Sequence, residues 1–468
     1  MSNSRRSFIR MSCCAAASMG VAASMERFGL LNALAQSGSS YKAMVCIFLF
    51  GGNDGNNLIA PVDNLGAAGF RYDDYLNIRI NAATGGLALG QGALLPVTAA
   101  TAQPSGARNF GFHPALAQTR ALFQANRAAV VANMGMLFEP ITRTEYRNRT
   151  KSIPANLFSH SDQQTAWQTS YADGFGTTGW AGRTADMAHS IYNVGAQFPP
   201  ILTVAGSAVF CTGNSTRPFA MVPNSTPGLQ GFNASSASDN ARLLSLQELL
   251  TFDSGISLVQ ATSSITGAAL AQSAKLSQAL QGVTLTTVFP TTSLGNQLFQ
   301  VAKILKARAS LDANLNRQIF FCSQGGYDTH SNQIADQNNL LGQLDAAMRA
   351  FYNATVEIGI ASNVTTFTLS EFGRTLKPAS GAGSDHGWGS HQIVMGDAVL
   401  GGDIYGRMPQ FALSGPDDSS SNGRWIPSTA LDQFGATLAR WFGVPDVDLP
   451  SIFPNLAKFP TSNLGFMS

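Results

Sequence analysis

Residue types that bind metal ions are concentrated in three glycine-rich segments of this sequence. Asp54 lies in segment 51–57, Asp328 and His330 lie in segment 324–330, and residues 385–391 read Asp-His-Gly-Trp-Gly-Ser-His. The chain has only six histidines, and three of them fall in these segments. Carboxylates and imidazoles are ligands that Zn²⁺ and Mn²⁺ accept, and glycines let the backbone turn sharply. We therefore predict a site for a divalent metal, zinc or manganese, with six ligand candidates: Asp54, Asp328, His330, Asp385, His386 and His391.

Each segment also has a simpler interpretation when it is taken alone. Asp54 stands between an asparagine and a glycine, which is typical of a plain turn. Segment 324–330 could cap a loop, whereas two histidines in segment 385–391 are harder to explain without a ligand. Together the segments favour a metal site over coincidence. His113 and His189 lack such a context, and we interpret both as structural.

Five apolar runs predict strands that are buried on both faces, as in a parallel sheet. Their residue ranges are 42–50, 128–134, 317–322, 364–369 and 392–395. Polar segments follow directly after the first, third and fourth runs. Because ligands of open α/β sheets bind beyond the carboxyl ends of the strands, we expect these three segments and segment 385–391 to meet at one edge of the sheet.

Helical patterns lie between the predicted strands. Apolar residues recur at helical spacing over 294–305 and 340–355. A third pattern begins with a capping box at 429–432 and ends at Gly443. The alternation predicts an α/β fold with a largely parallel central sheet and helices on both faces. Residues 205–290, which are rich in Ser, Thr and Ala, are predicted to form a helical insertion or cap, with helices over 239–251 and 256–281.

The first 35 residues have the pattern of a twin-arginine signal peptide. Arg5 and Arg6 precede a mildly apolar run over 11–25, and Ala33-Leu34-Ala35 supplies an A-x-A cleavage pattern. The run is short and rich in small residues, so a stable membrane span is not expected. We therefore predict a periplasmic or secreted protein that is recognised and exported by the twin-arginine export machinery. The rest, 36–468, is predicted to be a single α/β domain.

Composition excludes several classes of partner. Charged residues make up 12% of the chain and the formal net charge is +2, which gives no argument for nucleic acid or an anionic membrane. Three cysteines, Cys46, Cys211 and Cys322, remain after the signal. We interpret them as buried free thiols, with one disulfide as the alternative.

Six motifs resemble the signatures of the exported DUF1501 family, and together they span essentially the whole mature chain. They lie at 51–57, 159–163, 326–330, 371–375, 384–387 and 401–406. The family has no settled biochemical role, and it is grouped with the alkaline phosphatase and sulfatase superfamily of metal-dependent hydrolases. This resemblance implies a mixed, largely parallel sheet with one or two metal ions at its carboxyl edge.

The resemblance also implies roles for individual residues. Asp54 matches the first metal aspartate of the superfamily, and the doublet Asp385-His386 matches its Asp-His pair. Asp328 and His330 resemble its acid-then-histidine pair, although one residue separates them here and three do in many members. No histidine follows His391, which must therefore take the place of a later lone histidine or leave that place empty.

Two further residues are candidates for catalysis. The superfamily uses a nucleophile at the start of a helix, and Ser161 is the nearest match, beside His160 and Asp162. Arg374 could pair with a substrate oxyanion through two parallel hydrogen bonds. Its alternative interpretation is a loop arginine bound to Glu371 or to solvent.

Two functions from different classes follow from these residues. The first is an exported metal-dependent hydrolase of phosphate or sulfate esters, acting on a small or polymeric anionic substrate. The alternative is an exported binding or assembly protein that kept the same scaffold without catalysis. A redox protein finds little support, because the sequence has neither a dinucleotide fingerprint nor a C-x-x-C pair.

Overall fold

A computed structural model describes residues 41–80, 86–225, 228–229, 231–253 and 255–468. The predicted signal peptide lies outside these residues. Lys42–Ser468 form one compact unit. Its main sheet has the strand order β11-β5-β10-β9-β1-β8-β6-β7, and β12 also pairs with β5. The strands are β1 (Lys42–Leu49), β5 (Ala128–Gly135), β6 (Ile201–Thr203), β7 (Phe219–Ala220), β8 (Arg317–Gln324), β9 (Val364–Leu369), β10 (Ser390–Met395), β11 (Ile404–Tyr405) and β12 (Thr429–Ala430).

The centre of the sheet confirms the predicted parallel arrangement. β1 runs parallel to both β8 and β9, and Cys46 pairs in register with Phe321 on one side and Phe367 on the other. All five predicted apolar runs form strands. β10 is antiparallel to both of its neighbours, β5 and β9. Its beginning therefore lies at the edge where β1, β8 and β9 end.

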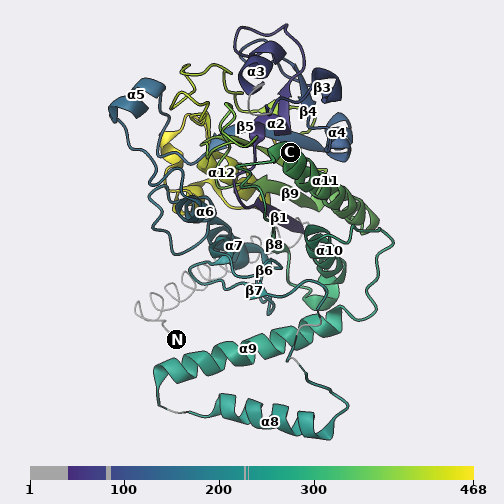
Figure 1. Cartoon of the computed structure of the whole chain (residues 1–468). Helices are drawn as coiled ribbons and strands as arrows, with labels where there is room; N and C mark the ends of the chain where they lie inside the picture. The colour runs from purple at the N-terminus through teal and green to yellow at the C-terminus, as the bar shows by residue number, and fades with distance from the viewer. Residues whose placement is uncertain (1–40, 81–85, 226–227, 230, 254) are drawn as a thin grey trace, which may run out of the picture. The chain divides into compact units, whose positions relative to one another are not determined.

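Helices cover both faces of this sheet (Figure 1). α10 (Ser293–Leu311) and α11 (Gln333–Glu357) pack together, with α10 against β8. On the other side, α7 (Trp180–Tyr192) packs against β8 and α12 (Leu431–Phe442) against β1. The α/β fold predicted from the sequence is confirmed.

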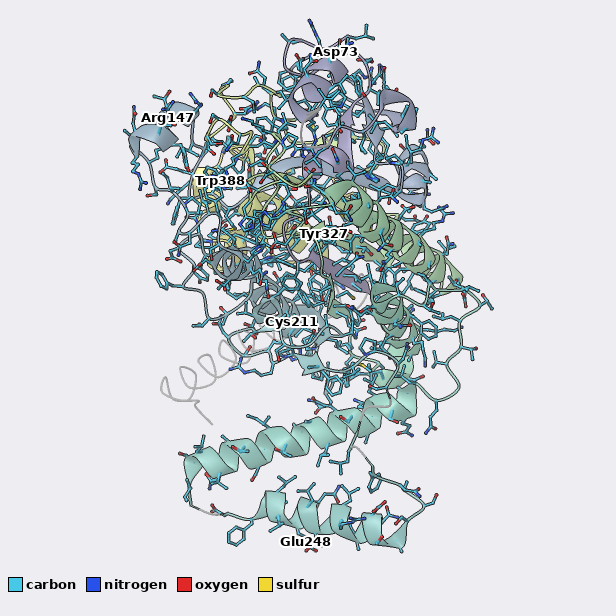
Figure 2. All side chains as sticks on the ribbon, viewed as in Figure 1. Asp73, Arg147, Cys211, Glu248, Tyr327 and Trp388 are labelled. Atoms are coloured by element: carbon cyan, nitrogen blue, oxygen red, sulfur yellow. The ribbon has the colours of Figure 1, made fainter. Side chains whose placement is uncertain are left out.

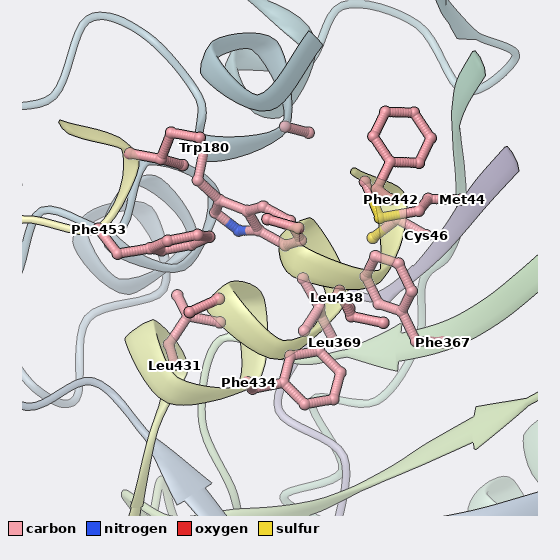
Figure 3. Packing of buried hydrophobic residues seen from close by; sticks show 14 of the residues in the cluster. Met44, Cys46, Trp180, Phe367, Leu369, Leu431, Phe434, Leu438, Phe442 and Phe453 are labelled. Carbon is pink, nitrogen blue, oxygen red and sulfur yellow. The ribbon is translucent and has the colours of Figure 1, made fainter. Parts of the chain in front are cut away.

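A large hydrophobic cluster lies between the sheet and the pair α7 and α12 (Figure 3). Trp180 of α7 stacks on Phe367 of β9, and Phe367 meets the ring of Phe434 of α12 edge-on. The cysteines Cys46, Cys211 and Cys322 are buried and free, as predicted. Burial of these aromatic side chains is a main source of stability for the strands that carry the polar loops.

The start of α12 corrects one local prediction. The predicted capping box ended at Asp432, but Gln433 is the residue whose side chain accepts the hydrogen bond from the Ala430 N–H, at 3.0 Å. Asp432 instead points into the core, where its carboxylate accepts hydrogen bonds from Ser170 and from the backbone of Asn455. Burial raises the pKa of Asp432 to about 7. The predicted end is confirmed, because Gly443 adopts the left-handed conformation that closes the helix.

The remaining elements surround this core. A three-stranded sheet has the order β2-β4-β3. The elements are α2 (Gly55–Leu58), β2 (Ile59–Pro61), α3 (Tyr72–Arg79), β3 (Leu95–Thr98), β4 (Asn109–Phe112), α4 (Ala117–Gln124), α5 (Arg143–Asn148), α6 (His160–Thr169) and α13 (Leu449–Ile452).

Two long helices occupy the region that the sequence singled out as different. α8 (Ala237–Thr251) packs on α9 (Ser257–Ala279), and α9 contacts α10. Figure 2 shows Glu248 on α8, which has no buried residue. None of the helices in the described part of the chain combines the length and the apolar character needed to cross a bilayer.

Candidate metal centre

Loops from four strands meet where β1, β8 and β9 end and β10 begins. The loop after β1 is bound to the loop after β9, because the Gly51 N–H donates to Glu371 at 2.8 Å. It is also bound to the loop after β8, where the Tyr327 N–H donates to the carbonyl of Phe50. Gly51 has φ +119°, and a Cβ there would lie 2.3 Å from the backbone nitrogen of Asp328. Only glycine allows this close approach.

The Asp328 carboxylate is the centre of a cluster of three histidines. Its Oδ1 lies 3.0 Å from Nε2 of His330 and 3.2 Å from Nε2 of His386. Its Oδ2 lies 3.3 Å from Nε2 of His160, the first residue of α6. The Nε2 atoms of His330 and His386 are themselves 3.1 Å apart. Four side chains from three distant parts of the sequence thus direct nitrogen or oxygen atoms toward one point.

The other ring nitrogen of each histidine faces an oxygen atom. Nδ1 of His160 is 2.9 Å from Oε1 of Glu371, and Nδ1 of His386 is 2.7 Å from the carbonyl of Phe158. Nδ1 of His330 lies 3.7 Å from Oδ1 of Asp385. For His160 and His386, the acceptor at hydrogen-bond distance places the proton on Nδ1 and leaves the Nε2 lone pair free, which is the tautomer that metal-ligating histidines use.

Glu371 anchors this arrangement from the interior. Its side chain is fully buried, and its Oε1 accepts hydrogen bonds from the Gly51 N–H and from Gln164 on α6 as well as facing His160. The hydrogen bond to Glu371 raises the pKa of His160 above its usual value. Burial has the opposite effect on His386, whose pKa lies below its usual value. His386 is therefore neutral at neutral pH.

Arg374 forms an ion pair with Asp328 inside the protein. Its side chain is fully buried, and its Nη1 donates to Oδ1 of Asp328 at 2.9 Å. The alternative pairing with Glu371 is not formed. Burial alone would raise the pKa of Asp328, but the hydrogen bond and charge of Arg374 outweigh it and leave that pKa below its usual value. Asp328 is thus ionised throughout the neutral range.

Three buried polar atoms around the cluster make no hydrogen bond. They are Nε2 of His160, Oε2 of Glu371 and Nη2 of Arg374. A buried polar group without a partner costs free energy, and such groups are rare in folded proteins. Two of these atoms belong to residues that contact the same carboxylate, because His160 and Arg374 both lie against Asp328.

Among the described residues, the ligand atoms of His160, Asp328 and His386 all lie within 4.8 Å of one another, and His330 adds a fourth close donor. The predicted residues Asp328, His330 and His386 are therefore brought together. Asp385 stands behind His330 with its side chain half exposed.

Asp54 lies apart from this set. It is buried, and its Oδ2 accepts 2.5 Å hydrogen bonds from Arg79 and Gln333, while its Oδ1 accepts from the backbone and side chain of Asn56. Both carboxylate oxygens are thus occupied by protein donors. This pattern is that of a structural carboxylate inside the fold.

His391 and Ser161 also point elsewhere. His391 belongs to β10 itself, where it is buried and its Nδ1 accepts a hydrogen bond from the Asn133 N–H at 2.9 Å. Ser161 is exposed on α6, and its hydroxyl lies 3.3 Å from that of Ser159. The residue of α6 that faces the cluster is its neighbour, His160.

His160 and Glu371 are the two members of the site that the sequence argument did not assign as ligand or support. In the Ser-His-Ser-Asp-Gln motif the prediction falls on Ser161, because the superfamily uses a nucleophile at the start of a helix. The histidine beside it carried the stronger signal, as one of only six in the chain. Nothing in the sequence spacing links residue 160 to residue 371.

Comparison with known proteins agrees with the motif resemblance. A model of the family described as "Protein of unknown function (DUF1501)" matches residues 41–442. No curated protein matches the chain.

Several solved structures resemble the fold weakly. One is Ps i-CgsB in complex with k-i-k-neocarrahexaose, at 9% identity and TM-score 0.31, covering 89% of this chain and 77% of that one. Another is the lipoteichoic acid synthase LtaP from Listeria monocytogenes, at 7% and 0.29, covering 84% and 75%. A third is the PsFucS1 sulfatase from Pseudoalteromonas sp., at 10% and 0.28, covering 89% and 70%. Likenesses this weak carry no functional weight.

Proposed function

The chain belongs to the DUF1501 family, whose description names no function, and from the site itself we propose that it is an exported, metal-dependent hydrolase of phosphate or sulfate esters. One observation carries the proposal. Three imidazole Nε2 atoms and the Asp328 carboxylate converge on one point, and the Nδ1 atom of each imidazole faces an oxygen.

The spacing of the donor atoms fits a small cation. Ligands about 2.0–2.1 Å from a tetrahedral zinc ion lie roughly 3.3–3.4 Å from one another. Oδ1 of Asp328 lies 3.0 and 3.2 Å from the Nε2 atoms of His330 and His386, slightly contracted from that spacing, and its other oxygen lies 3.3 Å from Nε2 of His160. Three imidazoles with one carboxylate favour zinc over manganese, which prefers oxygen ligands.

The residues around the cluster would each have a defined part in such a site. His160, Asp328, His330 and His386 would hold the ion, which supplies Lewis acidity toward an ester oxygen. Glu371 keeps the His160 ring oriented from the buried side. Arg374 keeps Asp328 ionised and in place through its hydrogen bond. The Asp328 side chain is 45% exposed, so substrate can reach the cluster, where an ester oxygen would bind the ion as a further ligand beside these four.

A direct experiment would strip the purified protein with a chelator and reload it with Zn²⁺ or Mn²⁺. We expect about one equivalent of bound metal by elemental analysis, and hydrolysis of 4-nitrophenyl phosphate or sulfate that depends on reloading. His386→Ala should abolish both. Wild-type protein that binds no metal after reloading would contradict the proposal.

One observation favours the second function, an exported binding or assembly protein. The Ser161 hydroxyl contacts Ser159, so the predicted nucleophile is not directed at the cluster. A site that retains its metal but hydrolyses neither ester would support this alternative. Hydrolysis that survives in Ser161→Ala would instead support a hydrolase that needs no serine nucleophile.

Export is proposed on the sequence pattern of residues 1–35. Replacing both Arg5 and Arg6 with lysine should leave the precursor in the cytoplasm, because the arginine pair is what the twin-arginine transporter recognises. Fractionation of cells that express each form would measure this. Full periplasmic yield of the double-lysine form would show that the assignment is wrong.

A further inference from the structure

We propose that Arg424 binds the oxyanion of the substrate at this site, an inference that rests on the proposed hydrolysis of anionic esters. Arg424 lies in the loop before β12, far in sequence from the histidines. Its Nε donates a hydrogen bond of 2.8 Å to the backbone carbonyl of His386. The guanidinium group is thereby tied to one of the four residues of the cluster.

A second contact ties Arg424 to the same histidine. Its guanidinium carbon lies 4.2 Å from the centre of the Phe158 ring, a cation–π contact. The carbonyl of Phe158 is the acceptor for Nδ1 of His386. Arg424 thus contacts the backbone of His386 and also Phe158, the residue whose carbonyl orients the His386 ring.

The terminal nitrogens of Arg424 remain available. No described residue forms a hydrogen bond with them or an ion pair with Arg424. By contrast, Arg374 binds Asp328 through Nη1, and Arg407 binds both oxygens of Asp417. A partly buried arginine with an unused pair of donors is suited to bidentate binding of a phosphate or sulfate group.

The loop that carries Arg424 is held in one conformation. The Arg424 N–H donates to Oδ1 of the fully buried Asp418, and its carbonyl accepts from both the backbone and the hydroxyl of Ser419. The other oxygen of Asp418 accepts from the Ser414 N–H. Backbone groups therefore occupy the carboxylate of Asp418, and the guanidinium is positioned before any substrate arrives.

The test compares Arg424→Gln with Arg143→Gln. Arg143 donates to the carbonyls of Asp418 and Ser420 in the same loop but makes no contact with the histidine cluster. Binding of inorganic phosphate and of sulfate is measured by titration calorimetry, with and without Zn²⁺, and zinc content by elemental analysis.

We expect Arg424→Gln to weaken binding of at least one anion by about 10- to 100-fold, as the loss of a charge-assisted pair of hydrogen bonds implies. Zinc is kept saturating during the titrations, so that any loss of zinc affinity is separated from the loss of anion binding, and Arg143→Gln should bind the anions like wild type. Arg424→Lys, which keeps the charge without the planar fork, should recover only part of the affinity. The anion with the larger loss identifies the ester class.

The alternative results have distinct meanings. Wild-type anion affinity in Arg424→Gln, or equal losses in both glutamine variants, would overturn the role of Arg424. A wild-type protein that binds neither anion would also overturn it. If the wild-type protein binds no zinc, and Arg424→Gln still binds the anions more weakly than wild type, the metal site is refuted and this inference stands.

Discussion

The Nε2 atoms of His330 and His386 lie 3.1 Å apart, and both are within 3.2 Å of the same oxygen of Asp328. Two neutral imidazoles that present lone pairs to each other repel, so this arrangement requires a proton or a cation between them. For His386, the Phe158 carbonyl that faces Nδ1 places the ring proton on the far side. The centre of the cluster is therefore the place where a cation is stabilised most.

Replacing His330 with alanine tests the cluster with little risk to folding. The His330 side chain is 48% exposed, so its removal should change the free energy of unfolding by less than about 0.5 kcal/mol. Zinc affinity should fall at least 10- to 100-fold, which is the loss seen when even an outer residue of a metal site is changed. Competition with a fluorescent chelator measures the affinity. Ser161→Ala is the matched control and should bind zinc like wild type.

Replacing Glu371 with glutamine tests the support behind His160. Because the hydrogen bond to Glu371 is the main cause that raises the pKa of His160, that pKa should fall in the variant. NMR titration of the His160 ring would show the shift, and zinc affinity should drop about 10-fold or more. Gln164→Ala removes an uncharged neighbour of the same oxygen and should leave the His160 pKa almost unchanged. Equal shifts in both variants would refute the role of the Glu371 charge.

Replacing Asp54 with asparagine separates a structural carboxylate from a metal ligand. Asp54 and Arg79 form a fully buried ion pair, and removing one partner leaves an unpaired buried charge. We expect the free energy of unfolding in urea to fall by about 3–5 kcal/mol, with zinc affinity of the folded protein unchanged. A stable variant that has lost its zinc would restore Asp54 as a ligand.

Stability should depend on pH through His113. This histidine is buried, its Nδ1 accepts a hydrogen bond from the Ala115 N–H, and burial lowers its pKa from 6.5 to about 4. Between pH 4 and pH 6.5, His113 therefore binds a proton in the unfolded chain but not in the folded protein. The resulting stability is complete above pH 6.5 and is lost as the pH falls toward 4, by about 1.4 kcal/mol per pH unit for one proton.

Urea denaturation of His113→Asn between pH 7 and 4.5 checks this expectation. Asparagine keeps an acceptor for the Ala115 N–H but does not titrate, so the slope of stability against pH should decrease by the contribution of one proton. An unchanged slope would show that His113 does not contribute.

Several features could be predicted from local sequence alone. Continuous apolar runs identified β1, β5, β8, β9 and β10, because strands buried on both faces need apolar side chains along their whole length. The same pattern placed Asp328, His330 and His386 at one edge of the sheet, since polar loops that follow parallel strands share that edge. Spacing along the chain determines these features.

Other features depend on side-chain direction and on pairing between distant residues, which only the tertiary structure decides. Asp54 follows β1 at the predicted edge, yet it turns inward to Arg79, 25 residues later. His391 lies within β10, so strand geometry directs its ring toward the backbone of Asn133. His160 enters the cluster because α6 begins beside Glu371, 211 residues away. Local sequence determines which loops meet at the sheet edge. The packing of α6 and α3 decides which side chains of those loops face the cluster. The reason is that the direction of a side chain depends on neighbours that are distant in the sequence.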